Sequence, residues 1–209
     1  LTYGTINTVA LRMFDYHIGV SDAMVQLLIS RGFDPQKLFS IYNGVEFPPK
    51  PARLSREEYL GSLGITFDVD TVVFGIAARL NPVKDIATLI RGFAGACKTC
   101  PNIRLIIAGD GEERQMLEEL AKEVCPEGSV IFAGWVKDTD SFYNAIDVNM
   151  LTSLSEGSPY ALVEGARMRC ATIATSVGGI PYMMESGVTG LLFTPRDVDT
   201  LTAYMVRLV

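Results

Sequence analysis

The sequence is poor in the residues that most often bind metals or carry out covalent chemistry. Its 209 residues include one histidine, His17, and four cysteines, and the one Cys-x-x-Cys pair ends at Cys100, just before Pro101. A structural zinc site needs a second such pair or well-spaced histidines, and a redox motif opens a helix rather than ending one. We therefore expect ordinary reduced thiols and no catalytic triad built on histidine.

Long apolar runs and an excess of positive charge are also missing. No run approaches the ~20 apolar residues that a membrane-spanning helix needs, although apolar residues make up 48% of the chain. The net charge of -6 argues against nucleic acid as a partner. These features predict a cytoplasmic protein with a large buried core. The chain begins with leucine and shows no signal peptide, so we expect a fragment or a processed form.

From residue 71 onward, apolar strand patterns alternate with helical patterns. Strands are expected at 72–78, 103–108, 130–133, 148–151, 172–175 and 190–193, and helices at 85–97, 112–124, 140–145, from 160 and from 198. The strand runs are continuously apolar, as in parallel strands that are buried on both faces. The fold class is therefore α/β, with a doubly wound, Rossmann-like parallel sheet whose ligands bind at the carboxyl ends of the strands.

The beginning of the chain does not follow this alternation. It predicts helices at 5–14 and 21–32 and strands at 17–20 and 38–42. A stiff, proline-rich linker follows at 47–51. We therefore divide the chain into residues 1–47, which look like part of a different domain, and residues 48–209, which form the doubly wound domain.

Two carboxylates lie on either side of a predicted helix start. Glu156 precedes a turn that begins at Gly157, and Glu164 lies one helical turn beyond the start at Tyr160. The first amides of a helix are unpaired and carry positive potential, which suits a phosphate group. A helix with one capping and one solvated glutamate is the alternative. The pattern fits a sugar nucleotide. The helix amides would bind its diphosphate, one carboxylate would bind the ribose, and the other would bind the sugar.

Two cations follow the first strand of the doubly wound domain. Arg79 and Lys84 lie five positions apart in the loop at the carboxyl end of that strand. A diphosphate supplies the negative charge that such a pair would hold. Solvated surface charges are the alternative interpretation.

The loops after the next two strands carry weaker signals. The run Gly109-Asp110-Gly111 lacks the last glycine of the nicotinamide-cofactor fingerprint, because Arg114 takes its place. Trp135 and Val136 could face a nucleobase, while plain packing of Trp135 is the other interpretation. Three Asp-x-Asp triplets begin at positions 68, 138 and 197. They precede a strand or open helices, so we expect capping rather than a metal site.

Several short motifs occur in order along the chain: Asn43-Gly44-Val45-Glu46, Ala78-Arg79-Leu80 with Lys84, Ala108-Gly109-Asp110-Gly111, Phe132-Ala133-Gly134-Trp135-Val136, Glu156 with Glu164, and Gly178-Gly179-Ile180-Pro181. Together they closely resemble the group 1 (family 4) retaining glycosyltransferases of the GT-B fold. The resemblance covers nearly the whole chain. It implies that residues 1–47 are the tail of the N-terminal, acceptor-binding lobe and that residues 48–209 are the donor-binding lobe.

The resemblance also implies which residues act on the donor. Arg79 and Lys84 would bind the diphosphate, Glu164 the ribose and Glu156 the transferred sugar, and Arg79, Lys84 and Glu156 would be the catalytic set. Transfer would take place on one face of the sugar, assisted by the leaving phosphate. Glu156 would then orient the sugar and would not act as a nucleophile.

Further donor contacts follow from the same resemblance. The residues concerned are Trp135 and Val136 near the base, and Gly157, Tyr160 and Ala161 at the phosphate and sugar. The chain departs from the family pattern at Ala78 and Asp85, where glycine is usual, and at Tyr182, where glutamate is usual. Only the contacts of the last loop are put in doubt by these changes.

The implied function is transfer of a sugar from a UDP- or GDP-type sugar nucleotide to a glycan or lipid acceptor in polysaccharide biosynthesis, with no metal or other cofactor. A binding module that transfers nothing and a GT-B nucleotide-sugar epimerase are the alternatives. The fragment alone is expected not to turn over acceptor. Apolar groups such as Ile18, Val20 and Leu28 would be exposed, and would allow self-association, unless they fold onto the donor lobe or another chain. Peripheral membrane contact through the missing lobe stays open.

Overall fold

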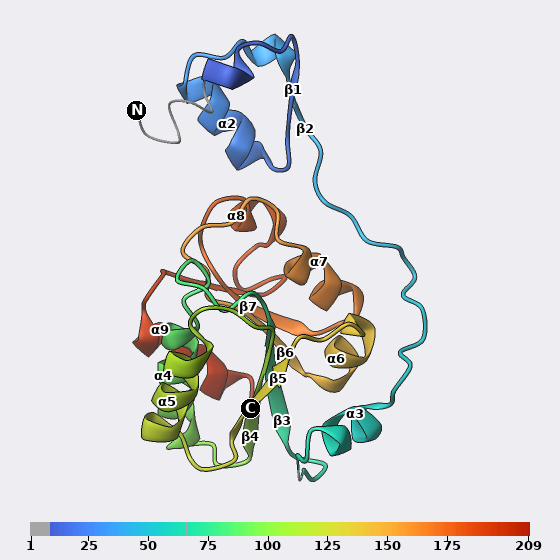
Figure 1. The fold of residues 1–209 in the computed structure, drawn as a ribbon, viewed down its shortest axis with the longest axis vertical. Helices are drawn as coiled ribbons and strands as arrows, with labels where there is room; N and C mark the ends of the chain where they lie inside the picture. Colours follow the sequence, from blue (N-terminus) through green and yellow to red (C-terminus); the bar gives the residue numbers. More distant parts are fainter. Residues whose placement is uncertain (1–8, 66) are drawn as a thin grey trace.

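The structure is a computed structural model that describes residues 9–65 and 67–209. Most of the chain folds around a parallel sheet of six strands in the order β5-β4-β3-β6-β7-β8 (Figure 1). These strands are β3 (Val72–Ala77), β4 (Ile103–Ala108), β5 (Val130–Gly134), β6 (Val148–Leu151), β7 (Ala171–Thr175) and β8 (Leu191–Phe193). The predicted α/β fold class with a doubly wound sheet is confirmed.

The strand order creates one point where the winding reverses. The chain enters the sheet at β3, moves outward to β5, returns to the other side of β3 at β6 and then moves outward again to β8. β3 pairs with both β4 and β6, with Phe74 opposite Val148 in the second pairing. In such sheets the loops after the two central strands diverge, which leaves a crevice for a ligand at their carboxyl ends.

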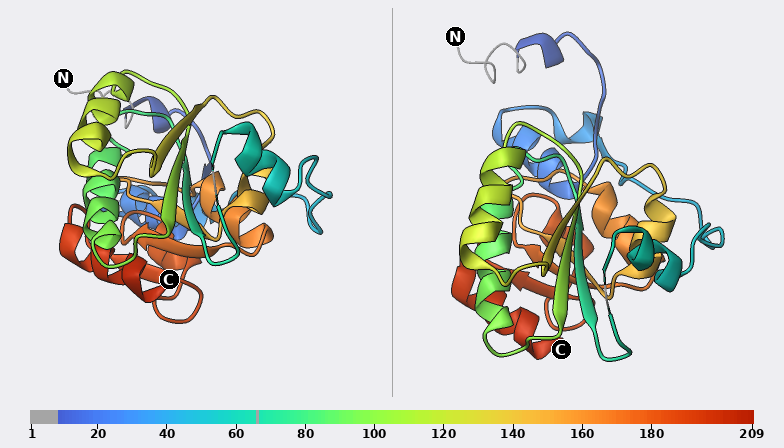
Figure 2. Two further views of the ribbon diagram at one scale, coloured as in Figure 1. Left: turned by 90° about the horizontal axis from the view of Figure 1, so that it is seen from below. Right: turned by 60° about the horizontal axis from the view of Figure 1, so that its bottom comes forward.

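Helices cover both faces of this sheet (Figures 1 and 2). One layer contains α4 (Ile86–Cys97), α5 (Arg114–Val124) and α9 (Val198–Arg207), and the other contains α3 (Arg56–Ser62), α6 (Thr139–Ala145) and α7 (Tyr160–Arg167). The short α8 (Ile180–Met183) packs beside α7. No helix within the described ranges is long and apolar enough to cross a membrane.

Neighbouring residues of a central strand pack into opposite layers. On β3, Phe74 joins the cluster that contains Phe93 of α4, whereas Val73 joins the cluster that contains Phe142 of α6. All four side chains are fully buried. Burial on both faces is the physical reason for the continuous apolar run that predicted this strand.

A small unit made from β1 (His17–Gly19), α2 (Asp22–Ser30), η1 (Pro35–Lys37) and β2 (Leu38–Ser40) precedes the sheet. Its two strands pair in parallel, and it lies above α7 and α8 (Figure 1). The ring of His17 packs edge-on against Phe33 with 4.9 Å between centroids, so this histidine belongs to the core of the small unit. Residues 5–8 of the predicted helix at 5–14 lie outside the described residues, and of the remainder residues 9–11 are helical.

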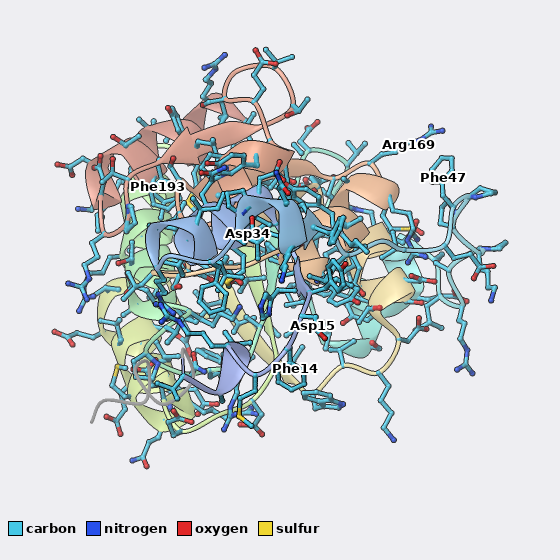
Figure 3. All side chains as sticks on the ribbon, turned by 90° about the horizontal axis from the view of Figure 1, so that it is seen from above. Phe14, Asp15, Asp34, Phe47, Arg169 and Phe193 are labelled. Atoms are coloured by element: carbon cyan, nitrogen blue, oxygen red, sulfur yellow. The ribbon has the colours of Figure 1, made fainter. Side chains whose placement is uncertain are left out.

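Helix α3 was not predicted. It follows the linker and starts with a capping box, because Ser55 Oγ accepts from Glu58 N at 3.2 Å and Glu58 Oε2 accepts from Ser55 N at 2.8 Å. The guanidinium of Arg56 ties the helix to Asp147 with hydrogen bonds of 2.8 and 3.0 Å. Figure 3 shows Phe47 of the linker at the outer edge of the molecule.

Candidate functional site

A cavity of about 820 Å³ opens at the carboxyl ends of the central strands, between the loops that follow β3, β4, β5 and β6. Eight of the residues that we assigned to a ligand from the sequence line it: Arg79, Lys84, Trp135, Val136, Glu156, Tyr160, Ala161 and Glu164. These residues come from separate loops and from the start of α7. The sheet topology therefore brings nearly the whole predicted set to one place.

Gly157 is the predicted site residue that faces elsewhere. A Cβ atom added to it would lie 3.2 Å from Val20 Cγ2, and one added to Gly179 would lie 1.8 Å from Gly157 O. Gly157 thus packs between the small unit and the turn at residues 178–179. Its contribution is to let these segments approach, and the structure does not place it on the cavity wall.

Lys84 and Glu156 form an ion pair inside the cavity. Lys84 Nζ lies 2.6 Å from Glu156 Oε1, and the two side chains are 27% and 11% exposed. Ser153 Oγ donates a hydrogen bond of 2.6 Å to the same carboxylate oxygen. Thr152 Oγ1 donates to the carbonyl oxygen of Lys84 at 2.9 Å, which fixes the loop that carries the lysine. Sequence reasoning assigned Lys84 and Glu156 to different parts of a ligand and did not foresee their direct contact.

Arg79 is held far more loosely than Lys84. Its side chain is 70% exposed, and its guanidinium lies 3.8 Å from the carboxylate of Glu112. A long, solvated ion pair of this kind contributes little to stability. Arg79 can therefore turn toward an anion in the cavity at small cost.

Helix α7 begins at Tyr160, as the sequence predicts, and its first turn carries no side-chain cap. Pro159 occupies the N-cap position and makes no side-chain hydrogen bond there. The first amides of the helix are left without a side-chain acceptor, next to the cavity that Tyr160 and Ala161 line. Glu164, one turn later, is half-buried in the same wall.

Tyr143 of α6 lies behind Glu164 and was not identified from the sequence. Its side chain is buried, and within the described part of the chain its hydroxyl has no hydrogen-bond partner. Burial, and then the negative charge of Glu164, raises the pKa of this hydroxyl well above its usual value. Glu164 thus has the buried hydroxyl of Tyr143 near its inner side and the cavity on its other side.

Glycines allow the loops around the cavity to pack backbone against backbone. A Cβ atom on Gly109 would lie 1.8 Å from the carbonyl oxygen of Ala78, and one on Gly111 would lie 2.2 Å from that of Leu80. Gly109 also has a φ of 143°, which other residues rarely adopt. The Gly-Asp-Gly run therefore presses the loop after β4 against the loop that carries Arg79.

The structure decides between the two interpretations of Trp135 and shows what two of the Asp-x-Asp triplets do. Trp135 is 75% exposed at the cavity, so it does not serve as core packing. Asp138 accepts from Ser141 N at 3.2 Å and Asp197 accepts from Thr200 N at 3.0 Å, so both cap helices as expected. In the residues that the structure describes, no group of three or more His, Cys, Asp or Glu side chains is arranged to hold a metal ion.

Comparison with known proteins connects this arrangement to a family. A family model described as glycosyl transferases group 1 matches residues 71–209. The uncharacterized glycosyltransferase MJ1607 of Methanocaldococcus jannaschii is 31% identical over 172 residues, which are 79% of this chain and 43% of that protein. The lipopolysaccharide 1,6-galactosyltransferase of Salmonella typhimurium is 24% identical over 204 residues, which are 93% of this chain and 52% of that protein.

A solved structure shows the same fold. The crystal structure of Anabaena Alr3699/HepE in complex with UDP-glucose has a TM-score of 0.80 and 25% sequence identity, and the match covers 92% of this chain and 53% of that one. The chain therefore spans about half the length of the relatives it matches. Because the family match runs from the start of β3 through α9 and includes the whole cavity wall, this chain belongs to the group 1 glycosyltransferases.

Proposed function

We propose that this chain binds a nucleotide-diphosphate sugar of the UDP or GDP type and forms the donor site of a retaining, family 4 glycosyltransferase. One observation carries the proposal: two cations, an uncapped helix start and two glutamates line a single cavity at the reversal point of the sheet. The complex of the Anabaena protein with UDP-glucose supports it.

The charges around the cavity match the electrostatic needs of the reaction. When the sugar leaves its nucleotide, negative charge grows on the diphosphate while the anomeric carbon becomes cation-like. Arg79, Lys84 and the amides at the start of α7 would stabilise that negative charge. Lys84 and the helix amides are held in place before the ligand arrives, and Arg79 would turn toward the diphosphate once it is bound. These groups belong to the chain itself, and the proposal includes no metal ion.

Glu156 would orient the transferred sugar. Its Oε1 already accepts hydrogen bonds of 2.6 Å from both Lys84 and Ser153, which fixes the carboxylate and occupies that oxygen. A carboxylate held in this way is suited to accept hydrogen bonds from sugar hydroxyls. The leaving phosphate, rather than a side chain, would then assist the acceptor, and the anomeric configuration would be retained.

The domain assignment and the acceptor are part of the same proposal. Residues 48–209 would be the donor lobe and residues 1–47 the end of the acceptor lobe, with the small unit resting on the donor lobe through the turn after β6. A glycan or lipid acceptor in polysaccharide biosynthesis is supported by the name of the Salmonella relative. The enzyme would work in the cytoplasm, with peripheral contact to a membrane through the rest of the acceptor lobe.

A donor panel tests the binding step. UDP, GDP, ADP and dTDP sugars would be added to the chain, and the midpoint of thermal unfolding would be measured with and without EDTA. We expect one nucleotide class to raise the midpoint, and EDTA to leave that shift unchanged. A panel in which no sugar nucleotide shifts the midpoint would disprove the donor site.

The transfer step needs the full-length gene product and a labelled donor. The configuration of the new glycosidic bond would be read by NMR from the anomeric coupling constant. Retained configuration supports the proposal, inverted configuration contradicts it, and conversion of the donor sugar without transfer would favour an epimerase.

A further inference from the structure

The turn before α7 is held by a residue from outside the larger sheet. Asn43 lies between β2 and α3, 115 positions before Ser158 in the sequence. Its side-chain Nδ2 donates to the carbonyl oxygen of Ser158 at 2.6 Å, and its backbone N donates to Ser158 Oγ at 3.3 Å. Ser158 is buried and stands two positions before the first residue of α7.

The small unit contacts the same turn through its β1–α2 junction. A Cβ atom on Gly179 would lie 2.8 Å from Ser21 Cβ, and one on Gly157 would lie 3.2 Å from Val20 Cγ2. Ser21 is fully buried and caps α2 by accepting from Met24 N at 3.3 Å. Seen from above, α2 and Asp34 lie over the larger sheet (Figure 3). The small unit thus rests directly on the turn that leads into α7.

Two further hydrogen bonds hold the part of the turn that ends at Glu156. Gly179 N donates to the carbonyl oxygen of Glu156 at 3.2 Å, and Leu154 N donates to that of Val83 at 2.7 Å. Both contacts come from the larger domain and fix the turn up to Glu156. Ser158 instead receives its two hydrogen bonds from Asn43, while its own hydroxyl donates to Met183 Sδ at 3.7 Å.

We infer that Asn43 is a positioning residue for the diphosphate. By fixing Ser158, it sets the direction in which the amides of Tyr160 and Ala161 enter the cavity. This inference rests on the proposed function, because it assumes that a diphosphate binds at the start of α7. Since Asn43 lies on the segment that joins the two sheets, a shift of the small unit against the larger domain would move Ser158 and change diphosphate affinity.

The test compares a diphosphate with its nucleoside. Asn43→Ala removes the Nδ2 donor but keeps the backbone donor. We expect the dissociation constant of UDP or GDP, whichever the donor panel selects, to rise about fivefold to tenfold, the change that follows from one lost hydrogen bond. Binding of uridine or guanosine should not change, because a nucleoside has no phosphate to meet the helix amides.

Asn144→Ala is the matched control. Its Nδ2 donates to the carbonyl oxygen of Leu54 at 3.4 Å, so the variant loses an asparagine-to-carbonyl hydrogen bond of the same chemical type, though a longer one, away from the cavity. Calorimetry would measure the diphosphate and ligand-observed NMR the nucleoside, with thermal unfolding of both variants as a check on folding. Diphosphate affinity in this control should stay at the wild-type value.

The outcomes separate the two claims. Wild-type protein that binds neither UDP nor GDP overturns the proposed function, and this inference with it. Wild-type binding together with unchanged diphosphate affinity in Asn43→Ala overturns the inference alone. An equal loss of affinity for the diphosphate and the nucleoside also overturns the inference, because a general loosening of the site would weaken the binding of both ligands.

Discussion

Lys84 and Glu156 are in contact across the reversal point of the sheet, with 2.6 Å between Nζ and Oε1. Glu156 is the more buried partner and keeps a second donor, Ser153. A diphosphate entering the cavity would compete with Glu156 for Lys84. Diphosphate affinity would therefore reflect the difference between the two interactions, while the sugar bound to Glu156 would meet a carboxylate that is already oriented.

The first prediction concerns the two cations. Arg79→Ala and Lys84→Ala should each raise the dissociation constant of the nucleoside diphosphate about tenfold or more, because charge-assisted hydrogen bonds contribute about 1.5–3 kcal/mol. Titration calorimetry measures this change. Lys98→Ala, at the exposed C-cap of α4, is the control and should bind like the wild type. Wild-type affinity in both site variants would contradict a diphosphate clamp.

The second prediction separates nucleotide from sugar at Glu156. Glu156→Ala frees Lys84 from its partner, so affinity for the bare diphosphate should stay the same or increase. Affinity for the nucleotide sugar should fall, because the sugar loses its acceptor. The measurement is the ratio of the two dissociation constants in variant and wild type, and a ratio that does not change would remove Glu156 from sugar binding.

The third prediction concerns Glu164 and the ribose. Glu164→Gln keeps the shape of the side chain but removes its charge, so nucleotides with intact ribose hydroxyls should bind more weakly. The substitution should reduce the affinity for the 2′-deoxynucleotide by a smaller factor, since that ligand offers one ribose hydroxyl fewer. Calorimetric titration of both ligands against both proteins tests this difference, and equal losses would mean that Glu164 does not contact the ribose.

The fourth prediction uses two glycines with positive φ. Gly178 (φ 53°) and Gly187 (φ 83°) carry similar strain when replaced by alanine, but only at Gly178 would the new Cβ meet backbone, 1.8 Å from the carbonyl oxygen of Glu156. Gly187 has nothing within 4 Å. Gly178→Ala should therefore reduce the free energy of unfolding by about 1–3 kcal/mol more than Gly187→Ala. An equal loss of unfolding free energy in the two variants, measured by urea denaturation, would show that the turn can relax around the new Cβ atom.

The fifth prediction concerns alkaline pH. Burial raises the pKa of the Cys97, Cys125 and Cys170 thiols from 9.0 to about 11. Between these values the unfolded chain loses protons that the folded chain retains, so the free energy of unfolding should fall as the pH rises from 9 to about 11. Urea denaturation across this range measures the slope. Cys170→Ala should show a shallower slope, and a flat profile in the wild type would contradict the raised pKa values.

Local patterns were enough to predict the larger sheet. The strand expected at 103–108 matches β4 because a short, continuous apolar run between polar turns is typical of a strand that is buried on both faces. The helix start at Tyr160 was also readable, since Pro159 cannot continue a preceding element. Helix α3 was not predicted although its capping box is visible in the sequence, because the proline-rich segment before it is typical of a linker.

Contacts between distant segments could not be predicted in the same way. Lys84 and Glu156 are 72 positions apart, and Asn43 and Ser158 are 115 apart. Whether such pairs meet depends on the strand order and on how the small unit packs on the larger domain. Local sequence patterns predict neither of these. The hydroxyl of Tyr143 gave no signal either, because a tyrosine beside a phenylalanine in a helix looks like ordinary core.

The small unit has far less buried apolar surface than the domain on which it rests. Among the residues that the structure describes, its core cluster contains three buried residues, Leu28, Phe33 and Leu38. Leu28 is therefore not an exposed apolar group, whereas Ile18 and Phe39 of the two strands are exposed. A segment with so little burial opens locally at low free energy. Backbone amides of β1, α2 and β2 should therefore exchange with solvent long before those of β3 and β4, so the chain would behave as two cooperative units joined at Asn43.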